Sequence, residues 1–443
     1  MSLQPFIRRV QSAKPYRWLG RVTKIIGLVV ESRGPAASVG EMCEIRSPDG
    51  KRAVIAEVVG FRDDRTLLMP LGDMTGIAHG DEVVSHGRQL TVRVGDGIRG
   101  RVLDGLGRPI DGKGPIIAAD EREVHGQAPC PMERPCIVEP LPTGIRAIDT
   151  LLTCGKGQRV GIFGGSGVGK SVLLGEVAKH TKAAVNVIAL VGERGREVQD
   201  FLQNNLNEGL SRSVVVAATS DQPALVRLKG AFVATTIAEY FRDQGHDVLL
   251  LMDSVTRVAT AMREIGLAIG EPPTTRGYTP SVFAQLPKLL ERAGRNRHGS
   301  ITGFYAVLVE GDDADEPLSD AVRAILDGHI VLSRKLASRG FYPAVDIHES
   351  VSRSMPAIVA PQHMSAAQRM KSVAYTYREA EDMINIGAYK KGSNREIDYA
   401  VSMRGMMDGF RRQAPSETSD MDRDIDRLVH MMASQTPELA GAT

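Results

Sequence analysis

The chain has 443 residues, of which 42% are hydrophobic and 24% are charged, and its net charge is +2. This is the composition of an ordinary globular protein of about three domains, and the small net charge gives no whole-chain case for a nucleic-acid partner. The chain shows neither a signal-peptide core nor an apolar run of the roughly 18 residues that would span a membrane. The four cysteines (Cys43, Cys130, Cys136 and Cys154) follow no disulfide or zinc-site spacing. We therefore expect a cytoplasmic protein whose membrane contacts are peripheral.

The chain begins with a short tail and a series of short strands. Residues 1–19 mix apolar and basic residues, so they could dock on a partner or an anionic membrane, and a frayed terminus is equally consistent. Residues 20–95 predict a small N-terminal β-barrel, because apolar or alternating runs are separated by turn residues. The predicted strands are Val22–Glu31, Met42–Arg46, Ala53–Phe61, Thr66–Met69, Glu82–Ser85 and Leu90–Val94. Phe61 is their only aromatic residue, which gives no stacking platform for single-stranded nucleic acid and favours a role in assembly.

The rest of the chain divides into an α/β region and a helical region. Residues 96–150 form a connection rich in glycine, proline and charge, after which strand and helix signals alternate up to residue 355. This alternation is typical of a parallel sheet with crossover helices, so we assign residues 96–355 to one α/β domain. Residues 356–443 predict a C-terminal helical domain. Its predicted helices are Ala366–Asn385, Glu396–Phe410 and Asp422–Ala433.

One glycine-rich stretch matches the phosphate-binding motif G-x-x-x-x-G-K-[ST]. It consists of Gly164, Gly165, Ser166, Gly167, Val168, Gly169, Lys170 and Ser171. Apolar residues lead into the stretch and a helix-like segment follows, which is the context that the motif requires. The glycines let backbone N–H groups wrap a phosphate, Lys170 supplies charge for the outer phosphates, and Ser171 offers a hydroxyl to Mg²⁺. The stretch therefore predicts a nucleoside triphosphatase, since a plain glycine-rich turn has no need of the Lys-Ser pair.

Two acidic residues follow patterns typical of buried strands. Glu193 comes after the apolar run Val187–Val191, and Asp253 comes after Val248–Met252. Because ligands of parallel sheets bind beyond the carboxyl ends of the strands, we expect both carboxylates on the same edge as Lys170. There Asp253 would hold the metal through its waters and Glu193 would polarise the attacking water. The alternatives are a helix N-cap for Asp253 and a salt-bridged turn for Glu193.

Nearly the whole chain resembles the catalytic subunits of rotary-type ATPases and, among them, the type III protein export ATPases. The resemblance runs from the predicted barrel through Val94–Gly95 and Gly100–Asp104 to Gly387–Tyr389, and it includes the family signature within Pro343–Ser352. The segment Gly165–Gly175 is most similar to flagellar export ATPases, whereas injectisome ATPases tend to have an alanine-rich loop there. The resemblance implies a RecA-like P-loop core that forms a homohexamer, uses ATP and Mg²⁺, and holds a nucleotide in each interface between subunits.

The resemblance also implies roles for single residues. Glu193 matches the catalytic glutamate that orients water, and Tyr342 matches the aromatic residue that packs on adenine. Arg194 and Arg257 match arginines near the γ-phosphate. Arg353 matches the arginine that reaches into the neighbouring subunit's site, which would make activity depend on assembly.

The implied partners are proteins. The four acidic residues Asp312, Asp313, Asp315 and Glu316 could by themselves bind a metal, face solvent or meet a basic partner. Of these, Asp312 and Asp313 match a segment that touches a central stalk, which implies a stalk-like coiled-coil protein in the pore. Residues 1–19 match a region used for self-assembly and for binding a peripheral regulatory, stator-like subunit. Export chaperones, export substrates and a membrane export gate at the inner membrane are the other implied partners. The segment Arg378–Asp382 lacks the long acidic run of ATP synthase β subunits, so coupling to a synthase-like rotor is not expected.

We therefore expect an ATPase that energises flagellar protein export by docking substrates or chaperones and loosening them for a membrane gate. An injectisome ATPase and an ATP synthase β-type subunit share this chemistry and differ in their partners. A RecA-type hexameric RNA translocase would need basic pore loops and aromatic RNA platforms, which the sequence does not show. A noncatalytic structural subunit would not need Lys170, Glu193 and Asp253 together.

Overall fold

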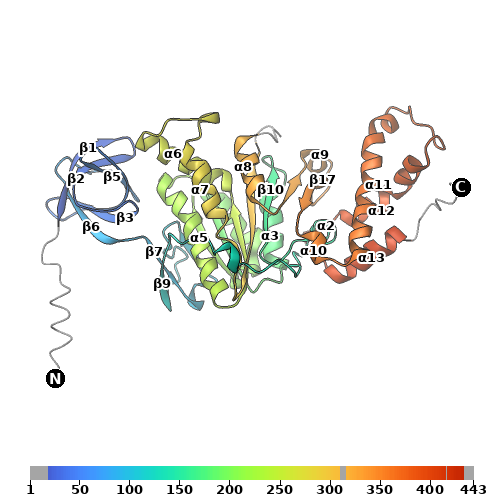
Figure 1. Cartoon of the computed structure of the whole chain (residues 1–443), viewed down its shortest axis with the longest axis horizontal. Helices are drawn as coiled ribbons and strands as arrows, with labels where there is room; N and C mark the ends of the chain where they lie inside the picture. The colour runs from blue at the N-terminus through green and yellow to red at the C-terminus, as the bar shows by residue number, and fades with distance from the viewer. Residues whose placement is uncertain (1–17, 310–315, 416, 434–443) are drawn as a thin grey trace, which may run out of the picture.

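The computed structural model describes residues 18–309, 316–415 and 417–433. Figure 1 shows three parts in a row: a β-barrel near the N-terminus, a central sheet flanked by helices, and a group of helices near the C-terminus. This arrangement confirms the predicted fold class. Residues 1–17 of the predicted tail, and Asp312 and Asp313, lie outside the described residues.

The barrel is built from six antiparallel strands. They are β1 (Leu19–Ile26), β2 (Val29–Arg33), β3 (Glu41–Arg46), β4 (Ala53–Arg62), β5 (Arg65–Pro70) and β6 (Glu82–Gln89), closed in the order β1-β2-β5-β4-β3-β6. The prediction of one continuous strand over Val22–Glu31 is wrong: a turn divides it at Gly27, whose φ of 56° lies in the left-handed region that favours glycine. The prediction of Leu90–Val94 as a barrel strand is also wrong, because β7 (Thr91–Val94) pairs with β9 (Asp120–Glu123) outside the barrel.

The central domain contains a nine-stranded sheet. Its strands are β8 (Val102–Asp104), β10 (Arg159–Gly164), β11 (Val185–Val191), β12 (Ser213–Ala218), β13 (Asp247–Asp253), β14 (Gly294–Arg295), β15 (Ser300–Leu308), β16 (Gly328–Leu332) and β17 (Val345–Ser352). The order is β17-β16-β10-β15-β13-β11-β12-β8, with β14 paired to β15. The pairs of β16 with β17 and of β14 with β15 are antiparallel, and the others are parallel. The carboxyl ends of β10, β11 and β13 therefore lie on one edge.

Helices precede, connect and follow these strands. They are α2 (Arg146–Leu151), α3 (Lys170–His180), α4 (Gly195–Asp200), α5 (Ala224–Asp243), α6 (Val255–Ile269), α7 (Pro280–Leu290), α8 (Pro317–Ile325), α9 (Arg334–Ser338) and α10 (Met355–Ile358). Shorter turns of 3-10 helix occur at Asp96–Ile98, Pro131–Glu133, Asn207–Arg212 and Thr275–Gly277, and a π-helical turn at Phe201–Leu206.

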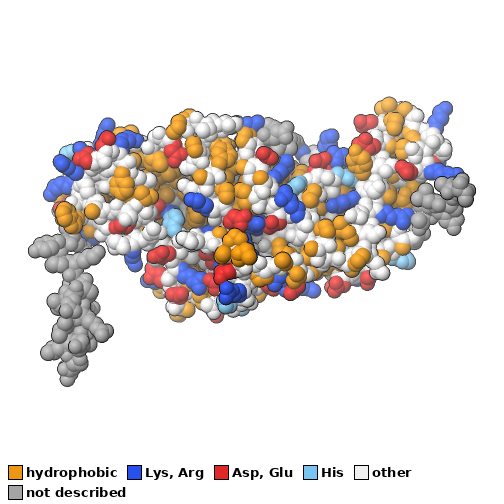
Figure 2. Space-filling model, in the orientation of Figure 1, with side chains coloured by type: hydrophobic (Ala, Val, Ile, Leu, Met, Phe, Trp, Pro, Cys, Tyr) orange, Lys and Arg blue, Asp and Glu red, His pale blue; other side chains and the backbone are white. Residues whose placement is uncertain are grey.

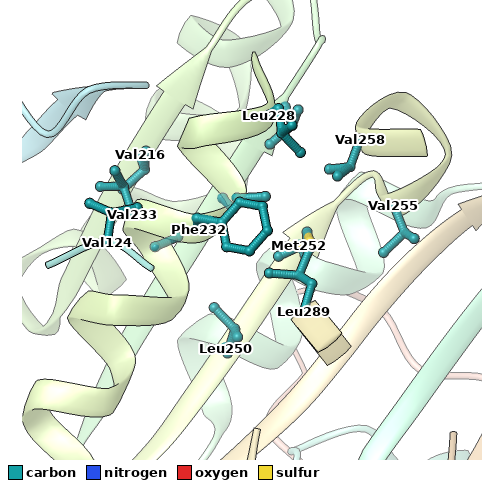
Figure 3. Packing of buried hydrophobic residues seen from close by; sticks show 14 of the residues in the cluster. Val124, Val216, Leu228, Phe232, Val233, Leu250, Met252, Val255, Val258 and Leu289 are labelled. Atoms are coloured by element: carbon teal, nitrogen blue, oxygen red, sulfur yellow. The ribbon is translucent and has the colours of Figure 1, made fainter. Parts of the chain in front are cut away.

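Successive side chains of a strand point to opposite faces of the sheet, and both faces are buried. In β13, Leu250 and Met252 pack with α5 and α6, whereas Leu249 and Leu251 pack in a second cluster that includes α3. Figure 3 shows the first cluster, with Leu250 and Met252 close to Phe232 of α5. This packing explains why the strands that lead to the site are continuous apolar runs in the sequence.

Within the described residues 359–415 and 417–433, three helices form the C-terminal part: α11 (Pro361–Asn385), α12 (Arg395–Arg411) and α13 (Met421–Ala433). They confirm the predicted helical domain. Their buried faces, which include Met370, Met403 and Leu428, join the same hydrophobic cluster as Ile148 of α2. The C-terminal helices are thus packed directly on the segment that precedes the phosphate loop. None of the described helices is long and apolar enough to cross a membrane.

Candidate active site

The predicted phosphate loop connects β10 to α3. Gly167 and Gly169 have φ angles of 78° and 94°, a region that favours glycine. Because α3 begins at Lys170, the unpaired N–H groups of its first turn and the positive end of its dipole face the loop. The loop therefore has the backbone geometry of a phosphate-binding site.

Backbone carbonyls hold Lys170 at this loop. Its Nζ donates to the carbonyl oxygen of Gly164 at 2.7 Å and to that of Gly165 at 2.5 Å. Burial lowers the pKa of the ammonium, and the charges of Asp253 and Glu193 oppose this shift. Since an ammonium group has three N–H donors, these two contacts leave one donor for a phosphate oxygen.

Ser171 and Asp253 form the side of the site that could hold a metal. Ser171 Oγ donates to Asp253 Oδ2 at 3.1 Å, and Asp253, the last residue of β13, is only 5% exposed. Burial raises the pKa of Asp253. A nearby cation would favour its ionised form, and hydroxyl and carboxylate oxygens are ligands that Mg²⁺ prefers. These residues therefore fit Mg²⁺.

No group of three or more His, Cys, Asp or Glu side chains that could hold a metal occurs among residues 18–309, 316–415 and 417–433. A magnesium ion at Ser171 would therefore take further ligands from phosphates and water. That ligand set is normal for Mg²⁺ at phosphate-transferring sites.

Glu193 lies just after β11 and pairs with Arg257 in the first turn of α6. Arg257 Nε donates to Glu193 Oε1 at 3.0 Å, and Arg257 Nη2 donates to Oε2 at 3.4 Å. Burial, a hydrogen bond with Glu197 and the charge of Asp253 together raise the pKa of Glu193 to about 8. A carboxylate of this basicity is suited to accept a proton from water near neutral pH.

Glu197 is a site residue that the motifs do not reveal. It lies in the first turn of α4, and its hydrogen bond with Glu193 lowers its pKa. One of its oxygens also accepts from the backbone N–H of Arg194 at 3.4 Å. The four-residue spacing between Glu193 and Glu197, at the start of a helix, is the signal that could have indicated this contact.

The structure brings together five of the predicted residues, namely Lys170, Ser171, Glu193, Asp253 and Arg257. Arg194 is exposed in the turn before α4. Its predicted contact with the γ-phosphate stays a prediction.

Arg353 lies at the opposite edge of the sheet. Ser352 pairs with Gly328 at the amino end of β16, and the Arg353 N–H donates to the carbonyl of Asp327 at 3.0 Å. The β10–β16 register places Asp327 beside Arg159, five residues before Gly164. At about 3.3 Å per residue, Arg353 lies roughly 16 Å along the sheet from its own phosphate loop. Its exposed side chain is therefore too far away to complete that site.

A cavity of about 410 Å³ opens beside the loop and is lined by Gly169 and Val172 of the loop and α3. Tyr342 forms one wall, and a Cβ atom on Gly169 would lie 3.6 Å from its ring. The segment Gln413–Pro415, which follows α12, forms another part of the lining and is not revealed by any motif. A mostly apolar cavity with an exposed aromatic face next to a phosphate loop suits a nucleobase.

Replacing Tyr342 by alanine is expected to raise KM for ATP about tenfold with a smaller effect on kcat, because stacking on an aromatic ring contributes about 1–3 kcal/mol per base. Steady-state hydrolysis over a range of ATP concentrations measures both constants. The Tyr342→Phe variant keeps the ring and should behave like the original protein. Unchanged KM in the alanine variant would exclude Tyr342 from base binding.

Comparisons with known protein families give matches in all three parts of the chain. The ATP synthase alpha/beta family matches through its beta-barrel domain at residues 22–87 and its nucleotide-binding domain at residues 144–352. The T3SS EscN ATPase C-terminal domain matches residues 359–430.

Individual relatives match over almost the full length. The chain is 52% identical over 437 residues to the flagellum-specific ATP synthase of Bacillus subtilis, covering 98% of this chain and 100% of the relative. It is 48% identical over 414 residues to the type 3 secretion system ATPase of Xanthomonas euvesicatoria, covering 93% and 94%.

A solved structure supports the same grouping. The assembled ATPase EscN from the enteropathogenic E. coli type III secretion system has a TM-score of 0.89 at 45% identity, with 94% of this chain and 100% of that chain covered. A second structure, of assembled EscN in complex with its central stalk EscO, matches this chain with a TM-score of 0.86 at 44% identity and the same coverage. Together with the phosphate loop and its carboxylates, these matches show that the protein belongs to the ATP synthase alpha/beta family of ATPases, in the group of flagellum-specific and type III secretion ATPases.

Proposed function

We propose that the protein hydrolyses ATP in the flagellar type III export apparatus, and that hydrolysis drives docking, release or unfolding of export substrates. The observation that carries this proposal is the 52% identity to the flagellum-specific ATP synthase of Bacillus subtilis over 98% of this chain. The type 3 secretion ATPase of Xanthomonas euvesicatoria is 48% identical, so an injectisome role is the alternative that the experiment below must separate.

The residues at the sheet edge divide the work of binding. The loop N–H groups and Lys170 would bind the phosphates, Ser171 and Asp253 would hold Mg²⁺, and Tyr342 would pack on the base. When bound, Mg²⁺ neutralises charge on the β- and γ-phosphates. The Ser171–Asp253 hydrogen bond supports this assignment because it places the hydroxyl ligand beside the carboxylate that would hold the metal through its waters.

Glu193 acts on the attacking water. As the water oxygen bonds to the γ-phosphorus and the bond to the bridging oxygen breaks, Glu193 accepts the water proton and ADP leaves with the bridging oxygen. Arg257 holds both carboxylate oxygens and fixes the orientation of Glu193. Arg194, the next residue in the turn, would lie near the γ-phosphate, as the family resemblance implies.

A ring of identical chains completes the site. Because Arg353 lies at the sheet edge opposite its own loop, it would serve the site of the next subunit, as expected for a homohexamer with a nucleotide at each interface. By analogy with EscN and its central stalk EscO, we infer that a coiled-coil stalk protein contacts the pore at Asp312 and Asp313.

The remaining partners are proposed from the family. The N-terminal residues 1–19 would bind a stator-like regulatory subunit, which would hold the protein in the cytoplasm at the inner-membrane export apparatus. Export chaperones and their substrates would dock before transfer to the membrane export gate.

A chromosomal Lys170→Ala replacement in the source organism tests the function. Secretion of flagellar hook and filament proteins should stop, while the variant protein accumulates normally and secretion of injectisome substrates, where present, continues. Normal flagellar secretion with lost injectisome secretion would instead assign the protein to an injectisome. Retention of flagellar chaperones, and not effector chaperones, by the purified protein is the matching biochemical result.

A further inference from the structure

Arg146 connects the base cavity to the C-terminal helices. It lies in α2 and is only 2% exposed. Its Nη1 donates to the carbonyl oxygens of Phe410 at 3.0 Å and Arg412 at 3.1 Å, at the carboxyl end of α12. Its Nη2 donates to Glu417. One guanidinium therefore binds the chain on both sides of the cavity-lining segment Gln413–Pro415.

The same side chain is paired with the last helix. Arg146 Nε lies 3.2 Å from Asp424 Oδ2 in the first turn of α13, and Asp424 is fully buried. The guanidinium also lies 5.9 Å from the centre of the Phe410 ring. Arg146 therefore fixes α12 and α13 relative to α2.

Gln413 lines the cavity and is hydrogen-bonded to the backbone of Arg146. Its Oε1 accepts from the backbone N–H of Arg146 at 2.8 Å, and its Nε2 donates to the carbonyl oxygens of Gly144 at 2.8 Å and Glu417 at 2.9 Å. Its own N–H donates to the carbonyl of Tyr342 at 3.1 Å. The amide donors of Gln413 are thus used within the protein, so its contribution to base binding is to place the cavity wall.

Two neighbouring arginines pack on the aromatic side of the cavity. The guanidinium groups of Arg411 and Arg412 each lie 4.9 Å from the centre of the Phe341 ring. Phe341 is buried and directly precedes Tyr342. The end of α12 therefore contacts the two aromatic residues of the cavity region as well as Arg146.

We propose that Arg146 is a positioning residue for the nucleotide base: it holds Gln413–Pro415 beside Tyr342 and so couples affinity for the base to the packing of α12 and α13. The proposal rests on the assignment of this cavity to the base of ATP. Because coupling between two sites is reciprocal, nucleotide binding stabilises the contact between α13 and α2, and a protein that shifts α12 or α13 changes nucleotide affinity.

The test compares a ligand that has a base with one that lacks it. Dissociation constants for Mg-ADP and for magnesium tripolyphosphate are measured by calorimetry on the full chain. In Arg146→Met the ADP constant should rise about tenfold, within the usual range of coupling factors. Tripolyphosphate binding should stay within about twofold, since the phosphate loop is a separate contact region. KM for ATP should rise while kcat changes much less.

Two further variants keep the test decisive if Arg146→Met does not fold. Gln413→Ala loosens the wall and leaves the Arg146–Asp424 ion pair in place, so it should show the same selective loss of ADP affinity. Arg146→Lys keeps a cation beside Asp424 and should recover part of the ADP affinity that Arg146→Met loses. The matched control is Arg404→Ala, which removes an arginine of α12 that packs on Tyr377 away from the cavity; it should bind both ligands normally.

Equal losses for ADP and tripolyphosphate would overturn the proposal, because they would show that Arg146 only stabilises the fold. Unchanged ADP binding in the Met and Ala variants would overturn it as well. Failure of the original protein to bind either ligand would instead contradict the nucleotide site itself.

Discussion

Replacing Arg353 by alanine should lower ATP turnover of the assembled protein by about 10³-fold or more, since an arginine supplied by a neighbouring protein contributes 10³–10⁵ in rate in related triphosphatases. Arg353 cannot reach its own loop, because it lies beyond the amino end of β16 while the loop follows the carboxyl end of β10. Its side chain is exposed, so the substitution removes no buried contact and should change the free energy of unfolding by less than about 0.5 kcal/mol.

Steady-state hydrolysis together with size-exclusion chromatography checks this prediction, because activity must be compared at equal assembly. Arg339→Ala is the matched control: Arg339 is an exposed arginine that pairs with Glu381 at 3.2 Å, away from the site. Its activity should be normal. Turnover of assembled Arg353→Ala close to that of the control would remove Arg353 from the reaction.

Replacing Glu193 by glutamine should lower kcat by about 10³-fold, within the range expected for loss of a general base. The amide is the same size as the carboxylate but cannot accept the proton of water. The pH dependence provides a second signature. The pKa of Glu193 is raised to about 8, so the fraction in the ionised, active form grows as the pH rises through that value. Hence kcat/KM should increase with pH and level off above about pH 9.

Rate measurements between about pH 6 and about pH 9.5 test both the loss of kcat and the pH dependence. The pH dependence of kcat/KM reports the pKa of the essential base in the nucleotide-free protein. The rising limb should be absent in Glu193→Gln. In Glu197→Gln hydrolysis should persist and the limb should move to lower pH, because the hydrogen bond and the negative charge of Glu197 raise the pKa of Glu193. A flat profile in the original protein would contradict the role of Glu193 as the base.

The parts of the site that the sequence predicts are those with local signals. Lys170 and Ser171 belong to a continuous motif, and Glu193 and Asp253 follow continuous apolar strands whose carboxyl ends must share an edge in a parallel sheet. The C-terminal helices were also predictable, since this region carries mixed charges and little strand signal. The barrel was predictable as a barrel but not in its strand limits, because an apolar run does not show the turn at Gly27.

The parts that the sequence does not predict depend on contacts between distant segments. Gln413 is held in the cavity wall by distant segments: the backbone N–H of Arg146, 267 residues earlier, donates to its Oε1. The position of Arg353 relative to the loop depends on β17 running antiparallel to its neighbour, which no local pattern specifies. Its role in a neighbouring subunit is implied by the family resemblance, and the geometry shows only that it lies far from its own loop.

The most direct test of a site divided between two subunits is a mixture of Lys170→Ala and Arg353→Ala chains. Each variant alone should be inactive. In mixed rings, an interface that joins the intact loop of an Arg353→Ala chain to the intact arginine of a Lys170→Ala chain is complete, so random mixing should restore about a quarter of the sites. Recovery of ATP hydrolysis toward that level, with mixed assembly verified by differently tagged chains, is the predicted result. No recovery in verified mixed assemblies would contradict the shared site.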